Sequence, residues 1–359
     1  MKGKIIDLEW QLLLPVVILV AISLLTLFSV DISYMKSQML FLGISILAFF
    51  VFANTNVKIF KLYYSPVYFI SIILLLLVFL VGVESRGSLR WVEFVGFRIQ
   101  FSEILKPFLA LSLASFIADK KTLNFSTLVK IFALLLPLTL LIFLQPDLGD
   151  ALIYGLVVVC VMMYIGFSYK YFATLLLPVL LAAPILWNFL HDYQKQRILT
   201  FLDPGRDPLG TSYNVIQSVI AVGSGMLIGK GLGMGTQSGL RFLPERHTDF
   251  IFATIAEQLG FVGSLLIIIC FGLFLYRIYK NLQNIDDRFS KIFYASVFFM
   301  FLLQVFVNIG MNIGILPIVG VTLPFVSYGG SSLLSNFIFL GLLTAIGKSS
   351  KPSDVLEIK

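Results

Sequence analysis

The residues best suited to chemistry in this chain are ionisable groups inside or beside long apolar runs. Glu103 and Lys106 are three positions apart in one run, so they share a helix face and can pair. Asp249 stands directly before another apolar run. Charged groups are costly in a membrane segment, so they usually face a cavity or a partner charge. A carboxylate in such a place can accept a proton, and a cation can stabilise an anionic group.

Each of these residues also has a structural interpretation. Glu103 and Lys106 form either a structural ion pair or the lining of a cavity for an ionic substrate. Asp249 either caps the helix that follows it or accepts a proton. Asp147 and Asp150 are expected to cap the next helix along the chain. The residue types alone leave these interpretations open.

Other kinds of site are disfavoured by spacing. Gly229-Lys230 looks like the end of a phosphate-binding loop, but Gly231 stands where Ser or Thr is required. His191 and His247 are isolated and lack the spacing of metal ligands. Glu257 lies two turns into an apolar run, and we expect it to pair with a cationic group in the bundle.

The composition excludes a soluble globule and a disordered chain. Of the 359 residues, 58% are hydrophobic and 13% are charged, whereas a soluble domain has about 25% charged residues. The basic residues behind the net charge of +7 are dispersed, which suits anionic lipid rather than nucleic acid. Cys160 and Cys270 lie in apolar runs and are expected to pack as small apolar side chains.

Ten apolar segments approach the length of a membrane-spanning helix, which is about 20 residues. A helix satisfies its own backbone in lipid, so we predict an all-α polytopic integral membrane protein with one domain over residues 1–359. A long outer loop, 192–249, separates the seventh and eighth spans. The predicted spans are 12–30, 39–53, 63–83, 101–118, 128–144, 151–167, 171–190, 250–276, 292–315 and 331–346.

The distribution of basic residues predicts the orientation. An even number of spans puts both termini on one side, and Lys and Arg concentrate in cytoplasmic loops. The loops 84–100 and 192–249 then lie on the outer side, where residues 213–227 have the apolar spacing of an amphipathic interfacial helix. The basic residues that mark the cytoplasmic side are Lys2, Lys4, Lys58, Lys61, Lys120, Lys121, Lys170, Arg277, Lys280, Arg288, Lys291, Lys348 and Lys351.

A series of motifs follows a fixed order along nearly the whole chain, and it resembles the SEDS family of bacterial shape, elongation, division and sporulation proteins. The resemblance is strongest to the elongation branch of that family. The motifs are Arg90-Trp91, Gln100-Phe-Ser-Glu-Ile-Leu-Lys106, Gln145-Pro-Asp-Leu-Gly149, Phe201-Leu-Asp-Pro-Gly-Arg-Asp-Pro-Leu-Gly210, Tyr213-Asn-Val-Ile-Gln-Ser218, Phe242-Leu-Pro-Glu-Arg-His-Thr-Asp-Phe-Ile-Phe252 and Leu323-Pro-Phe-Val-Ser-Tyr-Gly-Gly-Ser-Ser332.

The resemblance implies the SEDS fold and a peptidoglycan glycosyltransferase activity. Such enzymes polymerise lipid II, a disaccharide-peptide on undecaprenyl pyrophosphate, at the outer face of the cytoplasmic membrane during elongation. Their partners are a class B penicillin-binding protein, which crosslinks the strands, and the elongation machinery. Asp249 matches the essential acidic residue of the family. Glu103 and Lys106 match polar residues of its central cavity.

The implied reaction needs one carboxylate and several positive charges. Displacement of the pyrophosphate by a sugar hydroxyl inverts the anomeric carbon and needs one base, for which we predict Asp249. The leaving group needs charge stabilisation by basic side chains or by a divalent cation, Mg²⁺ or Mn²⁺, for which Asp249 is a possible ligand. No other cofactor is expected. The basic residues predicted to bind substrate, together with Glu103, are Arg90, Lys106, Arg197, Arg206, Lys230 and Arg246.

Three positions depart from the family pattern. The family usually has Pro, Thr and Pro where this chain has Phe101, Asp150 and Thr322. Phe101 and Thr322 are expected to alter only the local entry into a helix. Asp150 adds a negative charge beside Asp147, which would either weaken the binding of an anionic substrate or create a cation site.

Two other functions fit parts of the same pattern. A lipid II flippase would share the ten helices, the Gly- and Pro-interrupted segments and the charged cavity, but it needs polar lining toward both faces. A scaffold that only recruits an outer partner would leave Glu103, Lys106 and Asp249 without a role at membrane depth. We therefore favour the glycosyltransferase.

Overall fold

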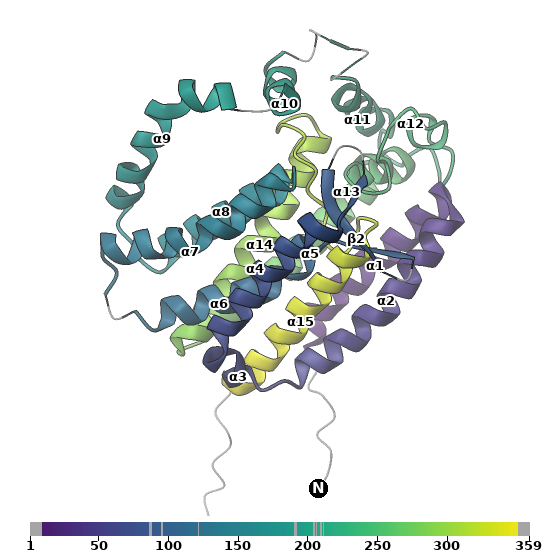
Figure 1. Ribbon diagram of the computed structural model, residues 1–359. Helices are drawn as coiled ribbons and strands as arrows, with labels where there is room; N and C mark the ends of the chain where they lie inside the picture. Colours follow the sequence, from purple (N-terminus) through teal and green to yellow (C-terminus); the bar gives the residue numbers. More distant parts are fainter. Residues whose placement is uncertain are drawn as a thin grey trace, which may run out of the picture.

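The protein is a bundle of long helices, most of which run side by side (Figure 1). This computed structural model describes residues 9–85, 88–94, 96–120, 122–189, 192–203, 205, 207–208, 210 and 212–350. Several residues named above therefore lie outside the described residues: Lys2, Lys4, Lys121, His191, Arg206 and Lys351.

All ten predicted spans are helices, so the predicted helical membrane fold is confirmed. The ten helices are α1 (Trp10–Val30), α2 (Ile32–Ala53), α4 (Tyr64–Val81), α6 (Lys106–Ala118), α7 (Phe125–Leu144), α8 (Leu148–Tyr164), α9 (Tyr169–Phe189), α13 (Ile251–Gln283), α14 (Arg288–Asn312) and α15 (Gly330–Ser350). Among the described residues, all of these except α6, α8 and α9 are long and apolar enough to cross a membrane by themselves.

Shorter elements form the connections between these helices. The loop between α4 and α5, whose strands the sequence did not predict, folds into a three-stranded antiparallel sheet of order β1-β2-β3. In the long loop, α11 confirms the predicted amphipathic helix but ends at Ser224, because Met226 has a φ of 49°. The shorter elements are α3 (Val57–Leu62), β1 (Val83–Ser85), β2 (Ser88–Phe94), β3 (Phe97–Ile99), α5 (Phe101–Ile104), α10 (Asp192–Leu202), α11 (Tyr213–Ser224) and α12 (Thr236–Gly239).

The centre of the bundle is built from α14 and α15. The most apolar 18-residue stretches of these helices are 61% and 78% buried. Both ends of the described chain lie at one end of the bundle. Glu9, before α1, accepts a hydrogen bond from Asn281 Nδ2 at 2.8 Å and lies 3.5 Å from Arg277 Nε. Gly347, near the end of α15, lies beside the same Glu9 carboxylate. This arrangement agrees with an even number of spans.

Helix α13 is broken at Gly260, whose φ of 66° and ψ of −161° are not helical. The segment 226–231 of the long loop supplies backbone partners for the groups that the break releases. Because lipid offers no hydrogen-bond partners, this exchange allows the helix to break within an apolar segment. The exchanged bonds run from the amides of Lys230 and Gly231 to the carbonyls of Glu257 and Gln258, and from the amides of Phe261 and Val262 to the carbonyls of Met226 and Leu227, at 2.8–3.1 Å.

We predict that Gly260→Ala destabilises the protein. A Cβ at this position would meet the Gly229 amide nitrogen and would lie 2.6 Å from Leu227 O. A side chain in such a backbone conformation also costs about 1–3 kcal/mol. The measurement is thermal unfolding of the purified protein in detergent. Gly272→Ala in the same helix is the control, since its Cβ would meet nothing within 4 Å; equal melting temperatures for the two variants would contradict the prediction.

Candidate active site

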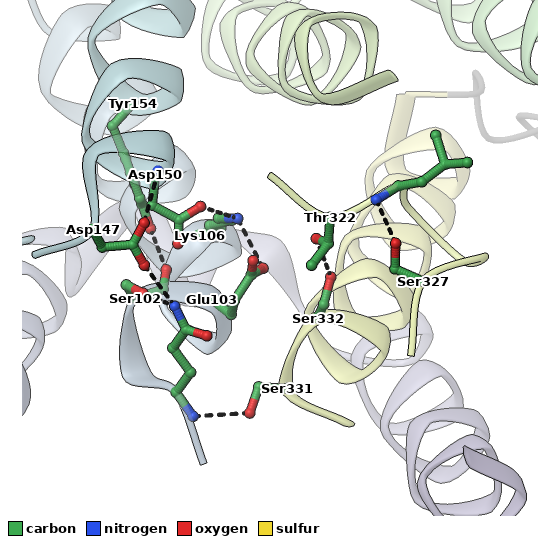
Figure 2. Close-up of polar contacts among 12 residues, drawn as sticks. Ser102, Glu103, Lys106, Asp147, Asp150, Tyr154, Thr322, Ser327, Ser331 and Ser332 are labelled. Atoms are coloured by element: carbon green, nitrogen blue, oxygen red, sulfur yellow. Dashed lines mark hydrogen bonds and ion pairs between the residues drawn. The ribbon is translucent and has the colours of Figure 1, made fainter. Parts of the chain in front are cut away.

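A buried cluster of charges surrounds Lys106, the first residue of α6 (Figure 2). Its Nζ lies 2.8 Å from Glu103 Oε2 and 2.8 Å from Asp150 Oδ1. The predicted pair of Glu103 and Lys106 is thereby confirmed, and Asp150 adds a second carboxylate to it. All three residues are at most 5% exposed. Ionised groups at such depth need a partner, so each one supports the others.

A third carboxylate, Asp147, links this cluster to the sheet. Its Oδ1 accepts the Asp150 amide at 3.1 Å, which confirms the predicted cap of α8. Its Oδ2 lies 3.4 Å from Arg90 Nη1 and accepts a hydrogen bond from Gln100 Nε2 at 2.7 Å. Arg90 belongs to β2 and its side chain is 31% exposed, so it is the most accessible charge of the cluster. Its place explains why a folded loop, rather than an irregular one, precedes α5.

Gln100 and α5 fix the cluster between two long helices. The Gln100 amide donates to Ser331 Oγ of α15 at 2.9 Å, and Tyr154 Oη of α8 donates to Ser102 O at 2.8 Å. Helix α5 ends after one turn, and α6 begins at Lys106 with Pro107 in its first turn. Leu105, between the two helices, keeps right-handed helical angles (φ −79°, ψ −12°), so Glu103 and Lys106 retain the spacing that lets them meet. Phe101 is the first residue of α5.

The cluster holds one more carboxylate than it holds cations. Glu103, Asp147 and Asp150 carry three negative charges when ionised, whereas Lys106 and Arg90 carry two positive ones. The Asp150 substitution therefore supplies a direct partner for Lys106. Among the described residues, no group of three or more His, Cys, Asp and Glu has the arrangement of a metal site.

Asp249 is half-buried in the turn that precedes α13. The N-cap position of α13 belongs to Phe250, and its side chain makes no capping bond. Instead, Asn312 Oδ1 of α14 accepts the Ala253 amide at 2.9 Å. A side chain of α14 therefore caps the first turn of α13, in place of the residue at the N-cap position itself.

The turn around Asp249 is held through its backbone carbonyls. Four successive residues, 246–249, each have a carbonyl that accepts a hydrogen bond from another element or from α13. The ring of His247 also stacks on Tyr34 of α2, with centroids 4.2 Å apart and planes at 8°. The backbone of Asp249 is thereby fixed. The donors to the four carbonyls are Thr254 Oγ1 at 2.9 Å, the Tyr328 amide at 2.9 Å, Ser327 Oγ at 2.8 Å, and Nδ2 of both Asn308 and Asn312 at 3.1 and 2.9 Å.

The loop 313–329 between α14 and α15 connects the Lys106 cluster with Asp249. Val319 and Val321 lie against Gly149 of α8, whereas Gly320 lies beside Asp249 Oδ2. Farther along this loop, Thr322 Oγ1 pairs with Ser332 Oγ of α15 at 3.0 Å, and Figure 2 draws this pair in one view with the Lys106 cluster. The loop therefore contacts both polar sites.

Lys230 is part of a second buried polar site. Its Nζ lies 3.2 Å from Glu257 Oε1 and 2.9 Å from Thr236 Oγ1. The predicted cationic partner of Glu257 is thus confirmed, although it comes from the long loop. Glu257 also accepts the amides of Gln237 and Ser238 at 2.9 and 2.8 Å. This carboxylate ties the long loop to α13.

Arg246 is 9% exposed, and its Nε has no hydrogen-bond partner among the described residues. Burial lowers its pKa, Arg241 acts in the same direction, and Asp31 opposes both. Hydrogen bonds from Ser33 lower the pKa of that Asp31, which begins α2. Arg197 lies in α10, but its side chain is outside the described residues, as is all of Arg206. The structure therefore brings the predicted basic residues to three different places.

Several polar residues of the site were not identified from the sequence. Asn308 and Asn312 are four apart in an apolar span, and such polar pairs are a usable signal. Gln100 and Ser327 gave no such signal, because they lie in motifs without an evident chemical pattern. Their roles depend on contacts between elements that are distant in the chain.

A cavity of about 220 Å³ lies between α4, α6, α7, α8 and α14, and Lys106 is part of its lining. The other lining side chains are mainly apolar, as expected of a groove for a hydrocarbon chain. Among them are Tyr64, Tyr68, Leu109, Leu134, Tyr154 and Met300.

The bundle of apolar helices with buried, paired charges defines a multi-pass membrane protein. The model of the cell cycle protein family that includes FtsW, RodA and SpoVE matches residues 5–352. The chain therefore belongs to this family, and the resemblance to SEDS proteins is confirmed.

Similar proteins cover almost the whole chain. The peptidoglycan glycosyltransferase MrdB of Escherichia coli strain K12 is 38% identical over 348 residues, which are 95% of this chain and 94% of MrdB. A chain of a peptidoglycan synthase complex, solved for its coordination of polymerization and crosslinking, is 29% identical with a TM-score of 0.84. That match covers 97% of this chain and 100% of the other. The rod shape determining protein RodA of Thermus thermophilus has a TM-score of 0.70 at 26% identity, over 97% and 99% of the two chains.

We predict that Lys106→Met strongly destabilises the protein. The change leaves Glu103 and Asp150 buried without their cation, which is expected to cost about 3–5 kcal/mol. The triple variant Lys106→Met, Glu103→Gln, Asp150→Asn should recover part of this loss, because it removes the unpaired charges. Thermal unfolding in detergent measures both. The control is Lys130→Met, at an exposed position of α7; an equal shift in the control would refute the proposed role of the cluster.

Proposed function

We propose that this protein is a peptidoglycan glycosyltransferase that polymerises lipid II into glycan strands. The observation that carries the proposal is the 38% identity to peptidoglycan glycosyltransferase MrdB over 95% of the chain. The site supports it, because it combines a rigidly held carboxylate, Asp249, with buried cations and an apolar cavity in one membrane bundle. Such a combination suits a substrate with a hydroxyl, a pyrophosphate and a polyprenyl tail.

In the proposed reaction, Asp249 acts as the general base. It takes the proton of the acceptor sugar hydroxyl, and the oxygen attacks the anomeric carbon of the donor. The bond from that carbon to the pyrophosphate breaks, and undecaprenyl pyrophosphate leaves with the bonding electron pair. A single displacement inverts the anomeric carbon and needs no second carboxylate. The separate fixation of the Asp249 backbone suits a base that must meet one defined proton.

Positive charges are assigned to the pyrophosphate by how loosely they are paired within the protein. Arg90 is 31% exposed, and Arg246 has an Nε without a hydrogen-bond partner among the described residues. We assign these two to direct contact with the leaving group. The Nζ atoms of Lys106 and Lys230 form shorter ion pairs with buried carboxylates, at 2.8 and 3.2 Å against 3.4 Å for Arg90, so we assign them, with Glu103, to shaping the substrate cavity. Arg197 and Arg206 keep the predicted role in substrate binding.

A divalent cation, Mg²⁺ or Mn²⁺, would further stabilise the leaving pyrophosphate. Asp249 would be its single carboxylate ligand, because Mg²⁺ sites commonly join one or two carboxylates to substrate phosphates. The expected outcome is that EDTA lowers the polymerisation rate and that added Mg²⁺ or Mn²⁺ restores it. An unchanged rate in EDTA would remove the cation from the proposal.

The proposed setting is the bacterial cytoplasmic membrane. The basic loops and the common position of both chain ends support cytoplasmic termini, with the long loop outside. The similarity to a chain of a peptidoglycan synthase complex supports a class B penicillin-binding protein as the crosslinking partner. We assign the pair to the cell elongation machinery.

We predict that Asp249→Asn abolishes polymerisation of lipid II by the full chain with its penicillin-binding partner. Loss of a general base should lower the rate by about 100-fold or more. Glycan strands resolved on a gel give the readout. Asp119→Asn, at an exposed position after α6, is the matched charge control and should remain active.

The same experiment separates the alternative function. A flippase would move lipid II across vesicles and make no polymer, and the broken helix α13 is the feature that favours this alternative. Movement of lipid II without any glycan product would overturn the proposed enzyme activity. Full polymerisation by Asp249→Asn would overturn the proposed base.

A further inference from the structure

Two asparagines of α14 hold both sides of the junction between the long loop and α13. Asn308 and Asn312 are one turn apart and fully buried. Their Nδ2 groups donate to the same carbonyl, that of Asp249, at 3.1 and 2.9 Å. Asn312 Oδ1 at the same time accepts the Ala253 amide of the first turn of α13 at 2.9 Å. One side chain thus defines where the loop ends and where the helix begins.

The same pair is itself held from three directions. Asn308 Nδ2 also donates to Val321 O at 2.7 Å, next to the Gly320 that lies beside the Asp249 carboxylate. Asn312 Nδ2 donates to Asn308 O at 2.8 Å. Ser218 Oγ of α11 donates to Asn312 O at 2.8 Å. The pair therefore connects α11, α13 and the loop 313–329 at the level of Asp249.

We propose that Asn308 and Asn312 are positioning residues for Asp249 in the transfer reaction. This inference rests on the proposed function, in which Asp249 is the base. Two amide donors on one carbonyl fix the backbone of Asp249. Because the carboxyl carbon of an aspartate is only two bonds from Cα, the position of the carboxylate follows that of the backbone closely. A base must lie within hydrogen-bond distance of the proton it takes, so small displacements reduce the rate.

The chemistry of the amide offers a way to separate positioning from simple structural support. The Asn312 amide accepts the Ala253 N–H through its oxygen and donates to the Asp249 carbonyl through its nitrogen. In Asn312→Asp the carboxylate still accepts the Ala253 N–H and still caps α13. It cannot donate when ionised, so the bond to Asp249 is lost. Asn308→Asp likewise removes the donor to Asp249.

The experiment measures lipid II polymerisation by the full chain in complex with its class B penicillin-binding protein. Asn312→Asp is expected to lower kcat by about 10- to 100-fold, with KM for lipid II within about 2-fold of the original value. The variant should still fold and form the complex, with a lower melting temperature because it buries a carboxylate at a position that is 0% exposed. Asn308→Asp should show the same pattern and provides an independent variant.

The matched control is Gln304→Met. Gln304 lies one turn earlier on α14, is 1% exposed, and its Oε1 has no hydrogen-bond partner among the described residues. Its replacement should leave kcat unchanged. In a double-mutant cycle with Asp249→Glu, the effect of Asn312→Asp should be far smaller than in the original protein, because both changes act on one carboxylate. Gln304→Met should combine additively.

Each outcome decides between the inference and its alternatives. Full kcat in folded Asn312→Asp and Asn308→Asp would overturn it, as would additive effects with Asp249→Glu. Loss of folded protein in both variants would show a structural role only, which also overturns it. Absence of polymer from the original protein would instead refute the proposed function, so the two failures are distinguishable.

Discussion

The structure depends on one property of lipid, which offers no hydrogen-bond partners and does not solvate charged groups. Every such group at membrane depth needs a partner within the protein. Lys106 therefore lies between Glu103 and Asp150, and Glu257 receives Lys230 and two loop amides. The same requirement explains why the break in α13 is filled by backbone groups of the long loop. Polar groups and loops that look unsuited to a membrane are thus the parts most firmly tied to the bundle.

This requirement also explains how a membrane bundle holds a carboxylate in a defined place. Asp249 follows a long loop, which by itself would be a poor support for catalysis. Donors from α14 and from the loop 313–329 fix the backbone around Asp249, and the ring of Tyr34 stacks on His247. Asp249 therefore has the precision of the surrounding helices. The Lys106 cluster is similarly rigid, so the site combines two fixed polar walls with an apolar cavity.

Much of the fold could be predicted from the sequence, because ten apolar runs leave few alternatives to ten helices. The pairing of Glu103 with Lys106 followed from helical spacing, and the capping role of Asp147 followed from its place before α8. The small sheet was missed because its strands are short and lie in a loop. The second partner of Lys106 was missed because Asp150 belongs to another helix. For the same reason the sequence placed the partner of Glu257 in the bundle rather than in the long loop.

The sequence by itself determined the membrane class, the helices, the family motifs and the identity of the groups able to do chemistry. These properties depend on residue type and on spacing within one element. The tertiary structure alone decided which charges neutralise one another, that Asn312 of α14 caps α13, and that a loop fills the break at Gly260. Such contacts join residues far apart in the chain, and their geometry arises only when the helices pack.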